Sequence, residues 1–280
     1  MKILVTGANG YLGQGIVKEL LDGGENVIAV GHKINNIDER AERIEADIFM
    51  IDNPFEYFGK PDILLHLAWK DGFVHYSDEH IDSLPKHYTF IKKIITSGVE
   101  RVAVVGSMHE IGFFEGSINE ETPCHPITPY GIAKNALRDL TEMLCKKNGV
   151  KFQWLRGYYI VGNSVYGSSV FSKITAAVLE GKKKFPFTMG QNQYDFIDYS
   201  TFCKCVAAAV CQEKTLGIIE ICSGKPEKLA NRAEHFIKEN GYSIMLEYGA
   251  FPDRPYDSKA IWGDSKKIEA ILERGRWHDV

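Results

Sequence analysis

The chain has 280 residues, of which 44% are hydrophobic and 25% charged, enough to bury a full core in one large or two unequal domains. Its formal net charge of −4 gives no electrostatic reason to expect a nucleic-acid partner. No apolar stretch approaches the roughly 20 residues that span a bilayer, and the N-terminus does not read as a signal peptide. We therefore expect a cytoplasmic protein that binds neither membranes nor nucleic acid.

The N-terminal segment predicts a strand, a glycine-rich turn and a helix. Residues 2–6 form an apolar run typical of a buried strand, and residues 11–21 carry apolar side chains at helical spacing. Between them, Gly7 is expected to allow a tight turn, Gly10 to let the backbone approach a pyrophosphate, and Gly13 to permit close helix–strand packing. Free amide groups and the helix dipole favour an anion there, so we predict a dinucleotide site.

Strands and helices alternate along the first 160 residues. The further strand candidates are residues 26–30, 43–46, 62–66, 101–105 and 151–155, and the further helix candidates are residues 77–97 and 128–147. This alternation predicts an α/β fold, a Rossmann-type doubly wound parallel sheet with helices on both faces. Because ligands of such sheets bind beyond the carboxyl ends of the strands, we expect the polar segments after these strands to meet there.

Ser107, Tyr130 and Lys134 form the candidate catalytic group. Lys134 follows Tyr130 by one helical turn on the same face, where a cation can lower the pKa of a tyrosine hydroxyl from its ordinary value of about 10. Ser107 can donate a hydrogen bond to the reacting oxygen. In the reductive direction, Tyr130 would be the general acid that protonates this oxygen as hydride reaches its carbon. Together with the glycine turn, the group predicts nicotinamide-dependent redox chemistry on a hydroxyl or a ketone.

The cysteines give no sign of a metal site. There are six of them, without a CxxC pair or a neighbouring histidine at zinc spacing. Cys203 and Cys205 fall in an alanine-rich helical pattern at residues 201–211, where small apolar packing is the expected role. We predict reduced thiols and no bound metal.

In this order along the chain, the motifs resemble those of the extended short-chain dehydrogenase/reductase family, of the NAD-dependent epimerase/dehydratase type. The segments that carry the resemblance are residues 6–13, Asp47-Ile48, His66-Leu67-Ala68-Trp69, Ser107, Tyr130-x-x-x-Lys134 and residues 155–162, 195–198 and 220–225. They cover nearly the whole chain. Because the family includes nucleotide-sugar epimerases, dehydratases and reductases, the resemblance implies a nucleotide-diphosphate sugar as the substrate.

The resemblance and the strand ends together give a set of expected site residues. The expected cofactor-binding residues are Gly7, Asn9, Gly10, Tyr11, Leu12, Gly13, His32, Lys33, Asp47, Ile48, Leu67, Ala68, Trp69, Tyr130 and Lys134. The expected substrate contacts are Met108, His109, Tyr159 and Arg254. Arg254 lies in a segment that resembles the arginine-bearing loop near the C-terminus of sugar-nucleotide enzymes.

The end of the second predicted strand bears on the choice of cofactor. Dinucleotide sites selective for NAD usually carry an acidic residue there, which binds both ribose hydroxyls. This chain has His32 and Lys33 instead, which can attract a 2′-phosphate. We therefore predict NADP, with NAD, or acceptance of either cofactor, as the alternative.

The residues after Ser107 help to separate the members of the family. Family dehydratases place an Asp-Glu pair there to remove water from the sugar, whereas this chain has Met108 and His109, and methionine cannot act as an acid or a base. A 4,6-dehydratase is therefore disfavoured. The remaining readings are an NADPH-dependent reductase of a 4-keto sugar, which the missing acid and the short chain favour, and a 4-epimerase that retains NAD. A non-catalytic NADP-binding sensor or scaffold is the alternative of another class, disfavoured because the catalytic group is complete.

The sequence also predicts a domain organisation and an assembly. Residues 1–162 together with about 193–221 are expected to form the dinucleotide-binding domain. Residues of about 163–192 together with 222–280 are expected to form a smaller C-terminal substrate-binding region. The resemblance and the amphipathic patterns of residues 77–97 and 128–147 suggest a homodimer joined through a four-helix interface.

Overall fold

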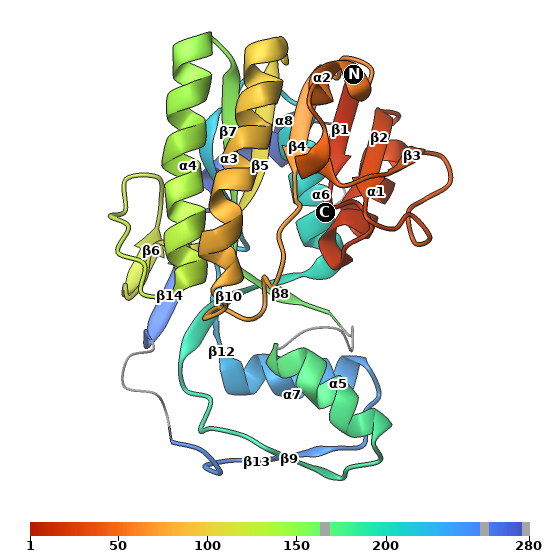
Figure 1. Cartoon of the computed structure of the whole chain (residues 1–280). Helices are drawn as coiled ribbons and strands as arrows, with labels where there is room; N and C mark the ends of the chain where they lie inside the picture. Colours follow the sequence, from red (N-terminus) through yellow and green to blue (C-terminus); the bar gives the residue numbers. More distant parts are fainter. Residues whose placement is uncertain (163–168, 253–257, 276–280) are drawn as a thin grey trace.

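The structure is a computed structural model, and it describes residues 1–162, 169–252 and 258–275. Its largest element is a seven-stranded parallel sheet with the order β11-β7-β5-β4-β1-β2-β3 (Figure 1). The strands of this sheet are β1 (Lys2–Thr6), β2 (Asn26–Gly31), β3 (Glu42–Glu45), β4 (Ile63–His66), β5 (Arg101–Ser107), β7 (Lys151–Gly157) and β11 (Gly217–Ile221). The strands that follow β1 are added first on one side of it (β2, β3) and then on the other (β4, β5, β7, β11), which is the order of the doubly wound Rossmann fold.

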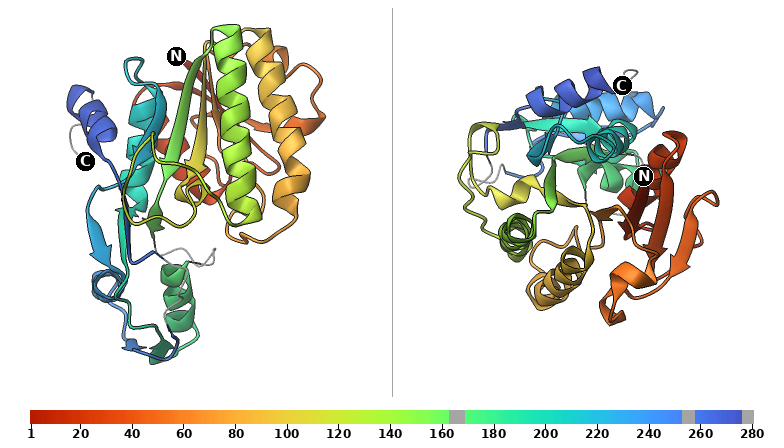
Figure 2. Two further views of the ribbon diagram at one scale, coloured as in Figure 1. Left: turned by 90° about the vertical axis from the view of Figure 1, so that its left-hand side faces the viewer. Right: turned by 90° about the horizontal axis from the view of Figure 1, so that it is seen from above.

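Both faces of the sheet are buried, which explains why its strands are continuous apolar runs. In β1, Ile3 and Val5 point into one hydrophobic cluster and Leu4 into the other, and none of the three is exposed. Helices α1 (Tyr11–Asp22), α6 (Tyr199–Val210) and α8 (Lys266–Arg274) cover the first face, and α3 (Glu79–Ser97) and α4 (Pro129–Asn148) the second (Figures 1 and 2). The α/β fold predicted from the sequence is confirmed.

The predicted elements differ from the observed ones by no more than two residues at their ends. The strand at 101–105 continues to Ser107, and the helix expected from residue 77 begins at Glu79. The alternation did not reveal the short helices η1 (Ile48–Met50), α2 (Pro54–Tyr57) and η2 (Met108–Glu110). They hold too few residues to show helical periodicity.

A second, smaller lobe lies below the carboxyl ends of the large sheet (Figures 1 and 2). Its four-strand path runs β12-β10-β14-β6, β8 also pairs with β10, and β13 pairs with β9 in a separate ribbon. The elements of this lobe are β6 (Gly116–Ile118), β8 (Tyr159–Val161), α5 (Val170–Leu179), β9 (Lys184–Pro186), β10 (Gln193–Asp198), β12 (Pro226–Lys228), α7 (Leu229–Glu239), β13 (Met245–Glu247) and β14 (Ala260–Gly263). A third hydrophobic cluster, which includes Phe171, Phe196 and Phe236, forms its core.

Asp195 holds three segments of this lobe together. Its buried carboxylate accepts hydrogen bonds from the backbone and hydroxyl of Ser223, both at 2.7 Å, and from the amides of Gly224 and Gly263 at 2.9 and 3.1 Å. Burial nevertheless raises the pKa of Asp195 above its ordinary value. The carboxylate thereby joins β10 to the turn after β11 and to β14, which accounts for the aspartate at residue 195 and the Ser-Gly pair at residues 223–224.

The predicted division of the chain into two regions stays a prediction, and four elements cross it: α8, β6, β8 and β10. Helix α8, assigned to the substrate-binding region, packs through Ile268 and Ile271 into the cluster beneath the large sheet. Strand β6, assigned to the dinucleotide-binding part, pairs with β14 in the smaller lobe. Among the helices of the described residues, none is long and apolar enough to cross a membrane.

Candidate active site

The glycine turn after β1 is held by backbone packing. Gly7 has φ +71°, and a Cβ there would lie 2.7 Å from the amide nitrogen of Ala68. A Cβ on Gly13 would lie 2.3 Å from the carbonyl oxygen of Gly7, so α1 packs directly against the turn. The amide of Gly10 donates to that same carbonyl at 3.0 Å. The predicted tight turn at Gly7 and the predicted close packing at Gly13 are therefore present.

The turn also leaves room for a ligand at the start of α1. A Cβ on Gly10 would meet only the Gly7 carbonyl oxygen, at 3.1 Å, with nothing else within 4 Å. Gly10 is the N-cap of α1 and supplies no side chain to bind the first amide groups of the helix. Tyr11 and Leu12, in the first turn, are partly exposed. Open space beside free helix amides fits the pyrophosphate of a dinucleotide.

Asn9 connects the glycine turn to the segment after β2. Its side-chain oxygen accepts from the amide of Asn36 at 2.9 Å, and a Cβ on Gly31 would lie 3.3 Å from the Asn9 Cβ. His32 and Lys33 follow Gly31 and are exposed. The strand end therefore presents the two residues on which the prediction of NADP rests.

Two expected cofactor residues follow β3. Asp47 is exposed and caps η1, where its carboxylate accepts from the amide of Phe49 at 3.0 Å. Ile48 is 6% exposed and, with Phe49 and Phe90, lines a groove between η1 and α3. Both residues lie at the carboxyl edge of the sheet, as the sequence predicts.

The segment after β4 brings an indole beside the candidate catalytic lysine. Leu67, Ala68 and Trp69 are all partly exposed. The Nζ of Lys134 lies 3.9 Å from the centroid of the Trp69 ring, within the range of a cation–π contact, and donates to the carbonyl of Val105 at 3.0 Å. Trp69 also contacts Tyr130 edge to face, with ring centroids 6.2 Å apart. The β4 segment thus contacts both members of the Tyr-Lys pair.

The three candidate catalytic residues come together where β5 meets the first turn of α4. The side chain of Ser107 lies near the Tyr130 hydroxyl and acts to lower its pKa. Thr128 caps α4 by accepting from the amide of Gly131, which sets the position of Tyr130 in the first turn. The structure thus brings Ser107, Tyr130 and Lys134 into one cluster at the carboxyl edge of the sheet.

The titration of this cluster differs from the sequence expectation. Burial raises the pKa of Tyr130 to about 12, although the hydrogen bond from Ser107 acts in the opposite direction. Burial also lowers the pKa of Lys134 to about 7. Lys134 was expected to lower the pKa of Tyr130, and that expectation is wrong for the protein alone. The physical reason is that the protein removes water from around both the hydroxyl and the amine, which disfavours the charged form of each.

The buried carboxylate of Glu110 supports the cluster through hydrogen bonds. Its carboxylate accepts from the amide of Ser107 at 2.6 Å, from the indole of Trp154 at 2.9 Å, and from Arg156 at 3.3 Å. Arg156 also donates to Glu220 at 2.7 Å, and burial raises the pKa of Glu220 to about 7. No role for Glu110 could be predicted from the sequence, because a glutamate in a loop gives no sign of burial.

Histidines that the sequence analysis left unassigned surround Tyr130 and Trp69. His66 is hydrogen-bonded to Thr6 at 2.8 Å and to His87 at 2.9 Å, and His87 stacks on Trp69 with centroids 4.6 Å apart. The Trp69 indole donates to Nδ1 of His80 at 3.0 Å. A sequence signal existed: five of the nine histidines fall between residues 66 and 109, and two of these are seven residues apart on one helix face.

Of the histidines whose rings contact Tyr130, His75 has the ring most nearly parallel to it. Its ring stacks on the Tyr130 ring with centroids 5.1 Å apart and an interplanar angle of 11°, and its carbonyl accepts from the Tyr130 amide at 3.1 Å. His109, an expected substrate contact, lies 4.2 Å from His75 and 5.9 Å from Tyr130, ring centroid to ring centroid. The loop after β4 and the loop after β5 therefore meet over Tyr130.

The other expected substrate residues differ in their surroundings. Met108 is 6% exposed and packs in the third hydrophobic cluster, a packing role in this structure. Tyr159 is partly exposed, and its ring lies 4.6 Å from that of Tyr194. Arg254 lies outside the described residues. Substrate contact by each of them stays a prediction.

The cysteines and the acidic residues form no metal site within the part of the chain that the structure describes. No disulfide bond joins any of the six cysteines in the described residues. Cys203 and Cys205 pack in the cluster beneath α6, where burial raises the pKa of each thiol to about 12. The predicted packing role of these two residues is confirmed.

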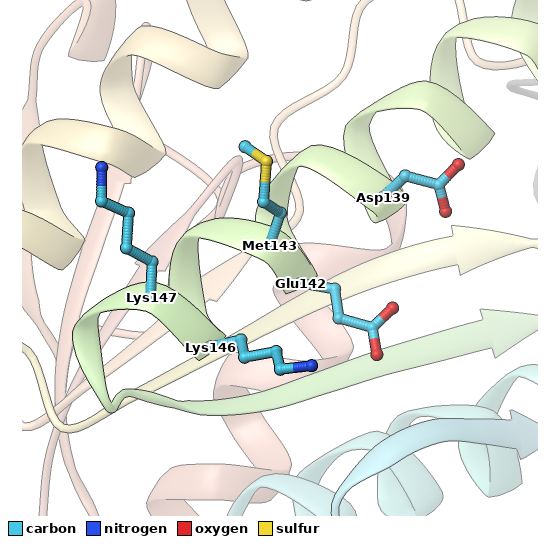
Figure 3. Close-up of a pocket in the computed structure, with 5 residues that line it drawn as sticks. All are labelled: Asp139, Glu142, Met143, Lys146 and Lys147. Atoms are coloured by element: carbon cyan, nitrogen blue, oxygen red, sulfur yellow. The ribbon is translucent and has the colours of Figure 1, made fainter.

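A hollow on the outer side of α4 is separate from this cluster (Figure 3). Its lining residues are Asp139, Glu142, Met143, Lys146 and Lys147. With a rise of 1.5 Å per residue, Met143 lies about 20 Å along the helix from Tyr130. The hollow is thus not part of the candidate active site.

The fold and the site together define a Rossmann-type dinucleotide-binding protein with a Ser-Tyr-Lys cluster at the carboxyl edge of its sheet. The family model described as "NAD dependent epimerase/dehydratase family" matches residues 3–222. The chain belongs to this family, as the resemblance predicts, and is an enzyme of the short-chain dehydrogenase/reductase type.

Individual relatives are similar along almost their whole length. The dTDP-6-deoxy-L-talose 4-dehydrogenase (NAD(+)) of Aggregatibacter actinomycetemcomitans is 39% identical over 94% of this chain and 99% of its own. A UDP-glucose 4-epimerase of Lactobacillus helveticus is 26% identical over 97% and 91%. The crystal structure of Thermotoga maritima UDP-glucose 4-epimerase with UDP-glucose superposes with a TM-score of 0.81, at 23% identity over 96% and 92%. That structure supports the fold alone.

Proposed function

We propose that the protein is a nicotinamide-dependent oxidoreductase that interconverts the 4-keto and 4-hydroxyl forms of a nucleotide-activated sugar. The observation that carries the proposal is the cluster of Ser107, Tyr130 and Lys134 at the sheet edge that also holds the glycine turn. In the reductive direction, hydride adds to C4, the O–H bond of Tyr130 breaks, and its proton goes to O4. Ser107 donates a hydrogen bond to the same oxygen and orients it.

The chain's own residues provide for a bound dinucleotide. The amides at the start of α1 would hold the pyrophosphate, beside the open side of Gly10. Lys134 would bind a ribose, and Asp47 and Ile48 the adenine end, roles that follow from the family resemblance. The dinucleotide, when bound, supplies or accepts the hydride. Oxygen atoms of a ribose beside Lys134 would favour its charged form, and this charge would lower the pKa of Tyr130 from about 12.

The observations disagree on whether the cofactor is NADP or NAD. The exposed His32 and Lys33 favour NADP, because no acidic residue at the end of β2 repels a 2′-phosphate. The 39%-identical relative is named for NAD(+). A substitution separates the two: if Lys33 attracts the 2′-phosphate, Lys33→Glu weakens NADPH binding about tenfold and leaves NADH binding unchanged. Equal changes for both cofactors would reject a role for Lys33.

The proposed substrate is a dTDP-linked 6-deoxy sugar, on the strength of the similarity to the talose dehydrogenase. Oxidation of the 4-hydroxyl of dTDP-6-deoxy-L-talose and reduction of the corresponding ketone are the two directions of one reaction. A 4-epimerase uses nearly the same catalytic group and is the second candidate, favoured by the names of more distant relatives. It would take hydride from C4 and return it to the other face without releasing the cofactor.

The division into a dinucleotide-binding domain and a substrate-binding region is part of the same proposal, as is the homodimer. The outer faces of α3 and α4 carry Ile81, Ile132 and Met143, which are 45, 46 and 52% exposed. A second copy would cover them in a four-helix interface. Light scattering of the wild-type protein and of Ile132→Asp tests this: a dimer that becomes a monomer supports the interface, and a wild-type monomer rejects it.

The first experiment is a binding measurement with four dinucleotides. Mass spectrometry first shows whether a cofactor co-purifies, and calorimetry then compares NADPH, NADP, NADH and NAD. Preferential binding of exchangeable NADPH supports the predicted reductase, and exchangeable NAD or NADH supports the same chemistry with the cofactor of the talose dehydrogenase. Tightly retained NAD supports the epimerase. Failure to bind any of the four rejects the dinucleotide site.

A further inference from the structure

We propose that His75 and His109 form a substrate-recognition pair that binds the sugar hydroxyls next to the reacting carbon. The proposal rests on the proposed function, because it assigns these imidazoles to the sugar side of Tyr130. It adds a specificity-determining role for His75, to which neither the sequence nor the family resemblance gave one. The class of ligand that follows is an uncharged, hydroxylated sugar ring.

The two imidazoles lie beside the group that handles the proton. The ring of His75 is parallel to that of Tyr130 within 11°, and the His109 ring meets Tyr130 at 67°. The two histidine rings are 4.2 Å apart, centroid to centroid. Both imidazoles therefore lie beside the ring whose hydroxyl would protonate the sugar oxygen.

The ring nitrogens of the pair are available for hydrogen bonds. Across residues 1–162, 169–252 and 258–275, no protein group is hydrogen-bonded to the imidazole of His75 or of His109. The nearby His66, His80 and His87 differ, because their rings bind Thr6, Trp69 and each other. Both residues of the pair are partly exposed. Polar atoms at a site edge without protein partners are suited to binding a ligand.

Both histidines are held in place through their backbones, and among the described residues no hydrogen bond ties up their ring nitrogens. The amide of His109 donates to the Ser107 hydroxyl, and a Cβ on Gly131 would lie 2.3 Å from the His109 carbonyl oxygen. The loop that carries His75 is closed by the bond from the Ser77 hydroxyl to Asp71 at 3.0 Å. Each ring is therefore presented by a fixed loop, as specific recognition requires.

The chemistry of the pair selects for hydroxyl groups. Burial lowers the pKa of His109 to about 3 and the pKa of His75 below its ordinary value, so both rings are neutral near pH 7. A neutral imidazole offers one donor and one acceptor, which matches a hydroxyl group. It offers no charge to a carboxylate. A sugar with hydroxyl groups at its ring carbons is therefore favoured over a uronic acid.

A substrate-pair experiment tests the assignment. Steady-state kinetics are measured for dTDP-6-deoxy-L-talose and its 3-deoxy analogue with the wild type, His75→Ala, His75→Gln and the surface control His235→Ala. His235 is on α7, its side chain is 62% exposed, and its ring pairs with Glu227. If His75 or His109 binds the 3-hydroxyl, His75→Ala raises KM about tenfold for dTDP-6-deoxy-L-talose. The KM for the 3-deoxy analogue stays unchanged. His75→Gln, which keeps a donor and an acceptor, recovers part of the loss.

The outcomes that overturn the inference are distinct from those that overturn the proposed function. If His75→Ala changes both substrates equally, or changes neither, the recognition role is rejected. If the Kd of the cofactor changes as much as KM, His75 acts through the fold and the role is likewise rejected. If the wild type binds the dinucleotide but turns over no nucleotide sugar, the proposed function fails, and this inference fails with it.

Discussion

The glycine turn and the Tyr130 cluster lie at the same edge of the large sheet, but their properties arise in different ways. The turn works through its backbone: Gly7, Gly10 and Gly13 supply conformation, open space and close packing. The Tyr130 cluster works through buried side chains, where loss of water sets the pKa of Tyr130 and of Lys134. A backbone site can be recognised from residue spacing, whereas a buried site depends on packing that no local pattern contains.

The largest expected effect separates catalysis from binding. Tyr130→Phe removes the proton donor and keeps the ring that packs between His75 and Trp69. We expect turnover to fall by about 10²–10⁴-fold while the cofactor Kd stays as in the wild type, measured by steady-state kinetics and calorimetry. Tyr76→Phe is the matched control, because Tyr76 is 72% exposed on the same loop as His75. Unchanged turnover of Tyr130→Phe would contradict the catalytic assignment.

The next effect concerns the support beneath the cluster. Glu110→Ala removes the acceptor of the Ser107 amide and one of the two carboxylates that bind the buried Arg156. We expect the free energy of unfolding to fall by about 3–5 kcal/mol in denaturant titration. The exposed Glu121 provides the control, since Glu121→Ala should change stability by less than about 0.5 kcal/mol. Equal effects would mean that the buried network contributes no specific support.

Two glycine substitutions in the turn distinguish an effect on the stability of the protein from an effect on cofactor binding. Gly13→Ala places a Cβ 2.3 Å from the Gly7 carbonyl oxygen, and we expect a loss of about 1–3 kcal/mol of stability. Gly10→Ala meets only one atom, at 3.1 Å, so its stability should stay close to that of the wild type. Its cofactor Kd should nevertheless rise, because the methyl group occupies the open side of the turn. Normal dinucleotide binding by Gly10→Ala would place the pyrophosphate elsewhere.

The smallest effect is a pH dependence that belongs to Lys134. Its pKa is about 7 in the folded chain and near 10.5 when unfolded, so above pH 7 the unfolded state holds more protons. Stability conferred at this site therefore rises with pH, by at most about 1.4 kcal/mol per unit. The window from pH 7 to 8.5 avoids the buried thiols, which oppose the trend at higher pH.

Comparison of the wild type with Lys134→Met in that window isolates the effect. Denaturant titrations of the protein without cofactor, at pH 7.0 and 8.5, should show a rise for the wild type that the variant does not share. Parallel pH profiles of the two proteins would mean that Lys134 stays charged in the folded state. That result would contradict the claim that burial lowers the pKa of Lys134.

The sequence predicted most of the fold because the information is local. The apolar runs at residues 2–6 and 101–105 became central strands, and the spacing from Tyr11 onward became α1. The smaller lobe was predicted only as a region, since β12, β13 and β14 have three or four residues each and are assembled by Asp195 and by long-range pairing. Such strands carry no periodic signal.

The candidate site was predicted in part for the same reason. Ser107, Tyr130 and Lys134 were found from their order and spacing. The direction of the Tyr130 pKa shift was missed, because the sequence shows that a lysine is near but not that both groups are buried. His75 was missed because it comes from a loop whose contact with Tyr130 is purely tertiary.

The most direct test of the account follows hydride into the sugar. The protein is incubated with a dTDP-4-keto-6-deoxy sugar and reduced cofactor carrying deuterium at C4 of the nicotinamide, and the product is analysed by mass spectrometry and NMR. We expect one deuterium at C4 of the sugar for each cofactor oxidised, and uptake about 10²–10⁴-fold slower with Tyr130→Phe. In a parallel incubation with a sugar that carries a 4-hydroxyl group, inversion at C4 without net oxidation of the sugar would identify an epimerase. No conversion of any nucleotide sugar would contradict the proposed function.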